Sequence, residues 1–241
     1  MKEITGIVIR VNQFRDNDAM VTVLSNDKIY SFLARGVLKI KSKNASSVNL
    51  YNKSRFTLSS TKDGLSLRSG EVISSYENLR TDLDNLAALD FLGEVTNRLV
   101  ISDDATMAYL WLEACLDALN NAHHDPLTVC LIYLGAILRI NGSAPEVNEC
   151  VICHEKKPIV AMNYNRGGFI CRDCASGLHE AKTPVGELQI LRYIFKVDIA
   201  HITHAIFTIK EAKRILKDLA KFIQKEYDVT LKSIQLLDNL K

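Results

Sequence analysis

The 241-residue chain lacks the features that mark several classes of protein. Only 4 residues are proline and 47% are hydrophobic, a composition that excludes an intrinsically disordered chain. The longest apolar run, Leu127 to Leu138, has 12 residues, whereas a membrane-spanning helix needs about 20. Glu3 and Arg10 interrupt the stretch in which a signal peptide would need an apolar core. We therefore expect a folded cytoplasmic protein that does not associate with membranes.

The motifs of common enzyme classes are missing as well. The sequence contains no P-loop, HExxH, GxGxxG or nucleophile-elbow pattern. A metal-dependent nuclease could use Asp16, Asp18 and Asp27, but acidic residues spaced in this way are more typical of turns. We expect a protein that is not an enzyme.

The chain also lacks a strong net charge, because 30 Lys and Arg against 28 Asp and Glu give only +2. The charges are nevertheless segregated along the sequence. Residues 1–80 carry 13 basic and 7 acidic side chains, a net charge of +6, whereas residues 81–145 carry 2 and 9, a net charge of −7. Residues 146–182 are neutral and residues 183–241 have a net charge of +3. This distribution points to nucleic acid binding at the two ends of the sequence and to packing or protein partners in the middle.

The hydrophobic periodicity changes at the same boundaries. Residues 1–80 contain five short β-rich runs separated by turn signals, which predicts a small closed barrel or sandwich. From Thr81 the apolar residues recur at helical spacing, and further helices are predicted at 104–121 and 126–140, with Asp103 or Asp104 and then Asp125 as N-caps. The fold class is α+β multidomain. The predicted domains are a barrel at 1–80, a helical domain beginning at 81–145, a cysteine module at 146–180, and C-terminal helices at 181–241 that complete the helical domain.

The strongest chemical signal is a pair of CxxC motifs, Cys150 to Cys153 and Cys171 to Cys174. Each CxxC turn places two sulfurs on one loop, and two such loops can surround a tetrahedral zinc ion. Gly167–Gly168 suits a hairpin that brings the loops together. Four thiolates leave no open position for water, so we expect one structural zinc ion. Two disulfides are the alternative, which a reducing compartment disfavours.

Basic residues of the barrel concentrate in residues 34–43. Lys39, Lys41 and Lys43 alternate, so an extended conformation would align them on one side for phosphate groups, and Arg35 adds a guanidinium group. Further basic residues and the interleaved aromatic residues are Arg10, Arg15, Lys53, Arg55, Tyr30, Phe32, Tyr51 and Phe56. A barrel with cations and aromatic rings suits single-stranded nucleic acid. A solvated cationic edge over core aromatics is the alternative, and for each single aromatic residue it is the favoured one.

A second basic stripe accompanies a helix predicted at about 209–227. The apolar face comprises Ala212, Ile215, Leu216, Leu219, Ala220, Ile223 and Tyr227. The basic residues considered as a second DNA surface are Lys210, Lys213, Arg214, Lys217 and Lys221. A solvated helix face explains the same pattern, and both interpretations stay open.

The sequence resembles the RecO family of bacterial recombination mediators, in its zinc-bearing form. The resemblance rests on GIVIRVNQFRDNDAMVTVLSNDKIYSFLARGVLKIKS near the N-terminus, on residues 76–80 leading into 91–94, and on residues 140–145 followed by the two cysteine pairs. It implies an N-terminal OB-fold barrel followed by a helical domain with an inserted four-cysteine zinc module.

The resemblance also implies a function. Such proteins bind single- and double-stranded DNA, anneal complementary strands, and with RecR help to load RecA onto DNA coated with single-strand-binding protein. RecF and RecA are implied as indirect partners, and the protein would associate with the nucleoid when bound to DNA. Family members dock the acidic tail of single-strand-binding protein on the helical domain, where Arg139 is the cation expected to meet it. The rival function is a zinc-ribbon adaptor in transcription or translation that binds protein and does not anneal DNA.

Overall fold

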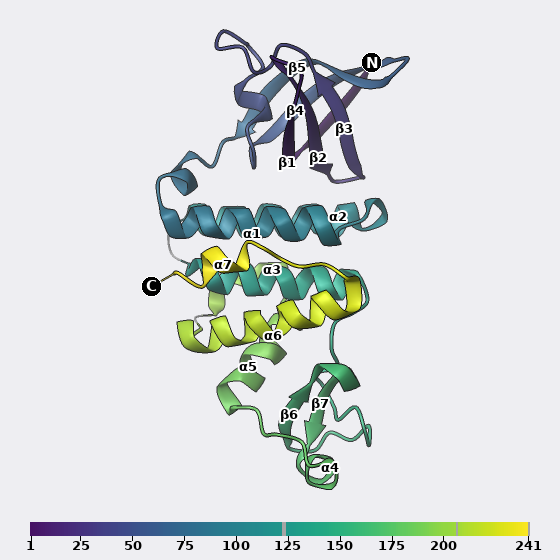
Figure 1. Ribbon diagram of the computed structural model, residues 1–241, viewed down its shortest axis with the longest axis vertical. Helices are drawn as coiled ribbons and strands as arrows, with labels where there is room; N and C mark the ends of the chain where they lie inside the picture. Colours follow the sequence, from purple (N-terminus) through teal and green to yellow (C-terminus); the bar gives the residue numbers. More distant parts are fainter. Residues whose placement is uncertain (122–123, 206, 241) are drawn as a thin grey trace.

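The structure is a computed structural model that describes residues 1–121, 124–205 and 207–240. Figure 1 shows a β-barrel at one end of the long axis, layers of helices in the middle, and a small two-stranded unit at the other end. This arrangement confirms the predicted fold class.

The barrel is closed in the strand order β1-β2-β3-β5-β4. The strands are β1 (Lys2–Phe14), β2 (Asp18–Ser25), β3 (Ile29–Ala34), β4 (Lys53–Thr61) and β5 (Gly64–Ser74), with the short helix η1 (Ser46–Val48) between β3 and β4. The β3–β5 pair is parallel and the other pairs are antiparallel. A five-stranded barrel of this kind is OB-like.

Alternate strand residues fill the barrel interior. Val21, Val23 and Leu58 are fully buried there. Tyr30, Phe32 and Phe56 are buried in the same cluster, so for these three aromatic residues the core interpretation is correct and base stacking is excluded.

The helical region is built around α3 (Pro126–Ile140), which is buried along nearly its whole length. It packs against the helices α1 (Leu83–Leu99), α2 (Ala105–Asn120), α5 (Val185–Ile194) and α6 (Ile209–Tyr227). The shorter elements are η2 (Glu77–Arg80), η3 (Ser102–Asp104), η5 (Ile199–His204) and α7 (Ile234–Leu237). None of the helices that the structure describes is long and apolar enough to cross a membrane.

Local capping explains two helix starts and corrects a third. Asp125 accepts a hydrogen bond from the Thr128 N–H at 2.7 Å, and Pro126 occupies the first turn of α3, as predicted. Asp104 does occupy the predicted N-cap position of α2, but its side chain makes no capping hydrogen bond, because η3 runs directly into α2 and Asp104 has helical dihedral angles. The bounds of α6 match the prediction, and Thr208 caps it by accepting from the Glu211 N–H.

The cysteine module (residues 146–180) contains β6 (Ile159–Asn163), η4 (Tyr164–Arg166), β7 (Gly168–Cys171) and α4 (Arg172–Leu178). The strands pair antiparallel across the predicted glycine turn, where Gly167 has a left-handed φ of 87°. A side chain on Gly168 would meet the Glu146 carbonyl oxygen at 2.3 Å, so only glycine allows this close approach. Arg192 on α5 donates to the Val147 carbonyl oxygen at 3.0 Å and fixes the module to the helices.

Candidate nucleic-acid interface and metal centre

The predicted basic segment lies in a loop of residues 35–45, the basic loop, which follows β3. The extended conformation predicted for Lys39 to Lys43 is wrong. Successive turns shape the loop instead, with hydrogen bonds from the Lys39 N–H to the Gly36 carbonyl oxygen at 3.2 Å and from the Ser42 N–H to the Lys39 carbonyl oxygen at 2.9 Å. The lysines are therefore presented around a compact loop rather than along a line.

The basic loop is anchored to the β1–β2 turn. The Asp18 carboxylate accepts a hydrogen bond from the Gly36 N–H at 2.6 Å, and the Asn17 carbonyl oxygen accepts from the Leu38 N–H at 3.0 Å. Gly36 has a left-handed φ of 62°, which glycine adopts without strain. Val37 is buried in the barrel core beside it. These contacts hold the loop in place although its charged side chains face solvent.

The cations of the basic loop have no ion-pair partner among the residues that the structure describes. Arg35, Lys39, Lys41 and Lys43 are exposed, and none makes an ion pair within the part of the chain that the structure describes. Four unpaired cations on one anchored loop form a surface that attracts phosphate groups.

The other predicted barrel cations differ in their surroundings. Arg10 is exposed and lines a cleft beside α1, and Arg55 forms an exposed ion pair with Glu71 on β5 at 3.4 Å. Arg15 lies at the β1–β2 turn that anchors the basic loop. The structure thus brings Arg15 to the basic loop and leaves Arg10 and Arg55 elsewhere on the barrel.

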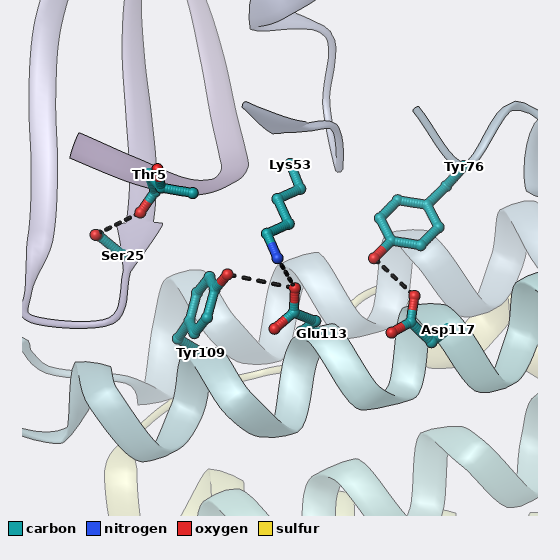
Figure 2. Close-up of polar contacts among 7 residues, drawn as sticks. All are labelled: Thr5, Ser25, Lys53, Tyr76, Tyr109, Glu113 and Asp117. Atoms are coloured by element: carbon teal, nitrogen blue, oxygen red, sulfur yellow. Dashed lines mark hydrogen bonds and ion pairs between the residues drawn. The ribbon is translucent and has the colours of Figure 1, made fainter. Parts of the chain in front are cut away.

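Lys53 belongs to the junction between the barrel and α2, drawn in Figure 2. Its ammonium group donates to the Glu113 carboxylate, which also accepts from the Tyr109 hydroxyl at 3.3 Å. Asp117 lies one helical turn after Glu113 on α2 and accepts a hydrogen bond from the hydroxyl of the buried Tyr76 at 2.9 Å. Burial and the Asp117 charge raise the pKa of Tyr76, so its hydroxyl stays protonated as the donor. Lys53 therefore helps to hold the barrel on the helices.

The second basic stripe is largely occupied by internal contacts. Lys213 donates to the carbonyl oxygens of Asp238 and Leu240, each at 2.7 Å, and Lys217 forms an ion pair with Asp238 at 3.0 Å. Arg214 pairs with Glu187, and Lys221 pairs with Asp218, both at 3.2 Å. Lys210 is exposed at the start of the helix. Most of these basic residues thus attach the C-terminal segment and α5 to α6. The buried face of α6 also contains Phe222, which the apolar face predicted from the sequence did not include.

Arg139 lies in a hollow of the helical region. Its guanidinium group donates to the Val197 carbonyl oxygen at 2.7 Å and stacks 5.3 Å from the Trp111 ring. The hollow has a volume of about 560 Å³ and an apolar lining that includes Met107 and Ile199. Burial lowers the pKa of Arg139, although the group remains charged at neutral pH. The hollow therefore combines an apolar lining with one half-buried cation.

The four predicted cysteine ligands meet at the opposite end of the molecule from the barrel. Their Sγ atoms all lie within 4.8 Å of one another, and Cys153 and Cys171 are 3.9 Å apart at sulfur. Metal–sulfur bonds of about 2.3 Å in a tetrahedron require sulfurs about 3.8 Å apart, so the four fit a single metal ion. A disulfide would need a separation of about 2.05 Å, and all four are free thiols.

The surroundings of the sulfurs favour a bound cation. Burial alone would raise the pKa of Cys150, but backbone N–H groups of Cys171, Cys153 and Ile152 point at its sulfur and lower the pKa to about 6. A hydrogen bond between the Cys174 thiol and the Cys171 sulfur raises the pKa of Cys174 to about 12, because it stabilises the protonated form of Cys174. A divalent cation among the four sulfurs would displace the thiol protons and let all four ionise.

The comparisons with known proteins agree with this architecture. A family model described as "Recombination protein O C terminal" matches residues 80–235, and "Recombination protein O N terminal" matches residues 1–76. The chain belongs to the RecO family.

Curated RecO proteins match the chain over nearly its full length. "DNA repair protein RecO" of Bacillus cytotoxicus is 30% identical over 99% of this chain and 97% of its own. The proteins of the same name from Bacillus cereus (strain AH187) and Bacillus anthracis are each 28% identical over the same shares. Membership in the RecO family supports a role in DNA repair and recombination.

Sequence reasoning missed some residues that the structure places beside the predicted ones. Glu113 accepts from Lys53, and Tyr109 donates to the same carboxylate, from a helix more than 50 residues away, which no local pattern reveals. Phe14 is 42% exposed at the β1–β2 turn. Its position at the end of a strand, directly before the turn residues Arg15 to Asn17, was the available signal.

Proposed function

We propose that this RecO-family protein is a non-enzymatic recombination mediator. It binds single- and double-stranded DNA, anneals complementary strands, and with RecR helps RecA to replace single-strand-binding protein on DNA. RecF and RecA itself are indirect partners. The protein acts in the cytoplasm and joins the nucleoid when bound to DNA.

The observation that carries the proposal is the basic loop. Arg35, Lys39, Lys41 and Lys43 keep their charges unpaired on a loop fixed by Asp18, in a chain of the RecO family. Lys53 of the same barrel is, by contrast, paired with the Glu113 carboxylate. DNA phosphates are the partner class that matches an unpaired cationic loop on an OB-like barrel.

The metal that we propose for the cysteine site is one structural zinc ion, held by Cys150, Cys153, Cys171 and Cys174. Thiolate ligands favour zinc among the common divalent ions, and a four-sulfur site has no position left for a reacting water. The ion would supply folding free energy to a short segment.

The Arg139 hollow is proposed as the contact for the acidic tail of single-strand-binding protein. The Trp111, Met107 and Ile199 side chains offer apolar contact, and the guanidinium group offers charge. Binding of a labelled tail peptide tests this, because Met107→Asp at the exposed rim should abolish binding and leave DNA affinity unchanged. Wild-type affinity in that variant would place the tail elsewhere.

The test of the main proposal combines binding with annealing. If each of the four loop cations neutralises one phosphate, log K for single-stranded DNA should fall with log salt at a slope of about −3. The Lys39→Ala/Lys41→Ala/Lys43→Ala variant should bring the slope to about −1 and slow the annealing of complementary strands. Lys156→Ala, which removes an exposed cation of the cysteine module, is the matched control and should leave both unchanged. Wild-type affinity and slope in the triple variant would refute the assignment, and strand cleavage by the pure protein with magnesium would refute a non-enzymatic role.

A further inference from the structure

The β1–β2 turn carries an aromatic side chain that the barrel core does not use. Phe14 is 42% exposed, whereas Tyr30, Phe32 and Phe56 are each at most 3% exposed. The part of the Phe14 side chain that stays in water forgoes burial free energy that the other three rings gain. Phe14 does not belong to the barrel core cluster, so contacts outside that core hold it.

The local geometry holds both the ring and the turn. The Arg15 guanidinium lies 5.3 Å from the centroid of the Phe14 ring, within the range of a cation–π contact. Gln13 stabilises the turn by donating from Nε2 to the carbonyl oxygens of Arg15 at 3.3 Å and Asp16 at 3.4 Å. The ring therefore sits on an ordered turn with a cation at its face.

A chain of contacts connects Phe14 with the basic loop. Phe14 is the register partner of Asp18, and the Asp18 carboxylate holds the Gly36 N–H at 2.6 Å. The aliphatic stem of Lys39 folds back over Gly36, since a Cβ at Gly36 would lie 3.7 Å from both Lys39 Cδ and Cε. The aromatic ring and the phosphate-binding cations consequently belong to one connected rim.

We infer that Phe14 is a base-stacking side chain that makes this rim selective for unpaired bases. The inference rests on the proposed function and deepens it. Cations attract the backbone of any nucleic acid, but a flat ring gains free energy only from a base whose face is open. Bases in a duplex are already stacked, so Phe14 would add affinity for single strands alone.

Three probes separate stacking from phosphate attraction. Binding is measured at one salt concentration to a short oligothymidine, to an abasic strand of the same length, and to a duplex of that length. Phe14→Ala should weaken oligothymidine binding about tenfold, because stacking on one base contributes roughly 1–3 kcal/mol. Affinity for the abasic strand and for the duplex should not change, nor should the salt slope, because the cations remain.

Phe14→Tyr is the matched control, because it keeps a ring of the same size and should retain wild-type affinity for all three probes. Equal affinity of Phe14→Ala and wild type for oligothymidine overturns the stacking role while leaving the proposed function intact. A loss of the same factor on the abasic strand also overturns it, since the ring would then only be shaping the loop. A wild-type protein that binds none of the probes overturns the proposed function itself.

Discussion

Gly135, in the middle of α3, gives a sharp test of how the central helix is packed. A Cβ added at this residue would lie 2.6 Å from the carbonyl oxygen of Ile194 and 3.0 Å from its carbonyl carbon. These obstacles are backbone atoms at the end of α5, so no side-chain rotation can relieve the contact. In Gly135→Ala, the higher helix propensity of alanine should stabilise the protein, whereas the steric overlap with α5 should destabilise it.

The two effects have opposite signs and different sizes. Replacing glycine by alanine inside a helix gains about 1 kcal/mol from backbone entropy. Against this, α5 would have to move by roughly 1 Å within a close-packed interior, and overpacking of this kind costs about 1–3 kcal/mol. The Ile194 carbonyl oxygen would lie much closer to the new Cβ than an ordinary van der Waals contact allows, so the upper half of this range of overpacking costs applies. We expect Gly135→Ala to lower the free energy of unfolding by about 1–2 kcal/mol.

Gly177→Ala in α4 is the matched control. A Cβ there meets no atom within 4 Å, so only the entropic gain remains, and stability should rise by up to about 1 kcal/mol. Urea unfolding followed by circular dichroism measures both variants, and an unchanged m-value would show that the denatured state is the same. A Gly135→Ala protein as stable as wild type would show that α3 and α5 do not pack this closely.

Three further predictions concern single side chains. Cys174→Ser changes one half-exposed ligand, so the purified variant should hold well below one zinc ion per chain by metal analysis and lose protease resistance in residues 146–180; full zinc content would refute the four-sulfur site. Burial alone would raise the pKa of Glu94, but hydrogen bonds from the Ser233 hydroxyl and N–H lower it below 4.5. The ionised Glu94 carboxylate therefore stabilises the fold above that pH, and this stabilisation is lost as the pH falls through the folded-state pKa. Glu94→Gln should therefore destabilise the protein at neutral pH and flatten the acid limb of its pH–stability curve; an unchanged limb would contradict this. Tyr76→Phe removes the hydrogen bond to Asp117 and should cost about 1 kcal/mol in urea unfolding, whereas no loss would mean that water replaces the hydroxyl without penalty.

Local patterns predicted much of the fold. The bounds of α6 follow from its apolar periodicity, and Asp125 followed by Pro126 marks the start of α3. The CxxC spacing predicted which four cysteines meet in space, and thus the candidate metal ligands, because each motif fixes two sulfurs by itself. In these cases the determining interactions span only a few residues.

Contacts between distant segments were beyond such patterns. Lys213 looked like a solvated or DNA-facing residue, yet it binds backbone carbonyl oxygens 25 and 27 residues later in the chain. The alternation of Lys39, Lys41 and Lys43 suggested an extended strand, but the bond between Gly36 and Asp18 turns the chain. A charged or turn-forming residue in the sequence indicates that its polar groups will be bonded. The partner of each group becomes known only from the tertiary structure.

The separation of the barrel from the cysteine module sets how the molecule can be approached. The two units lie at opposite ends of the long axis with the helical layers between them (Figure 1). If the proposed DNA binding by the barrel holds, the cysteine module would lie clear of the strand, and a protein bound at that end would not compete with the DNA. The helical layers around α3 therefore act as a spacer between two ends that can be contacted separately.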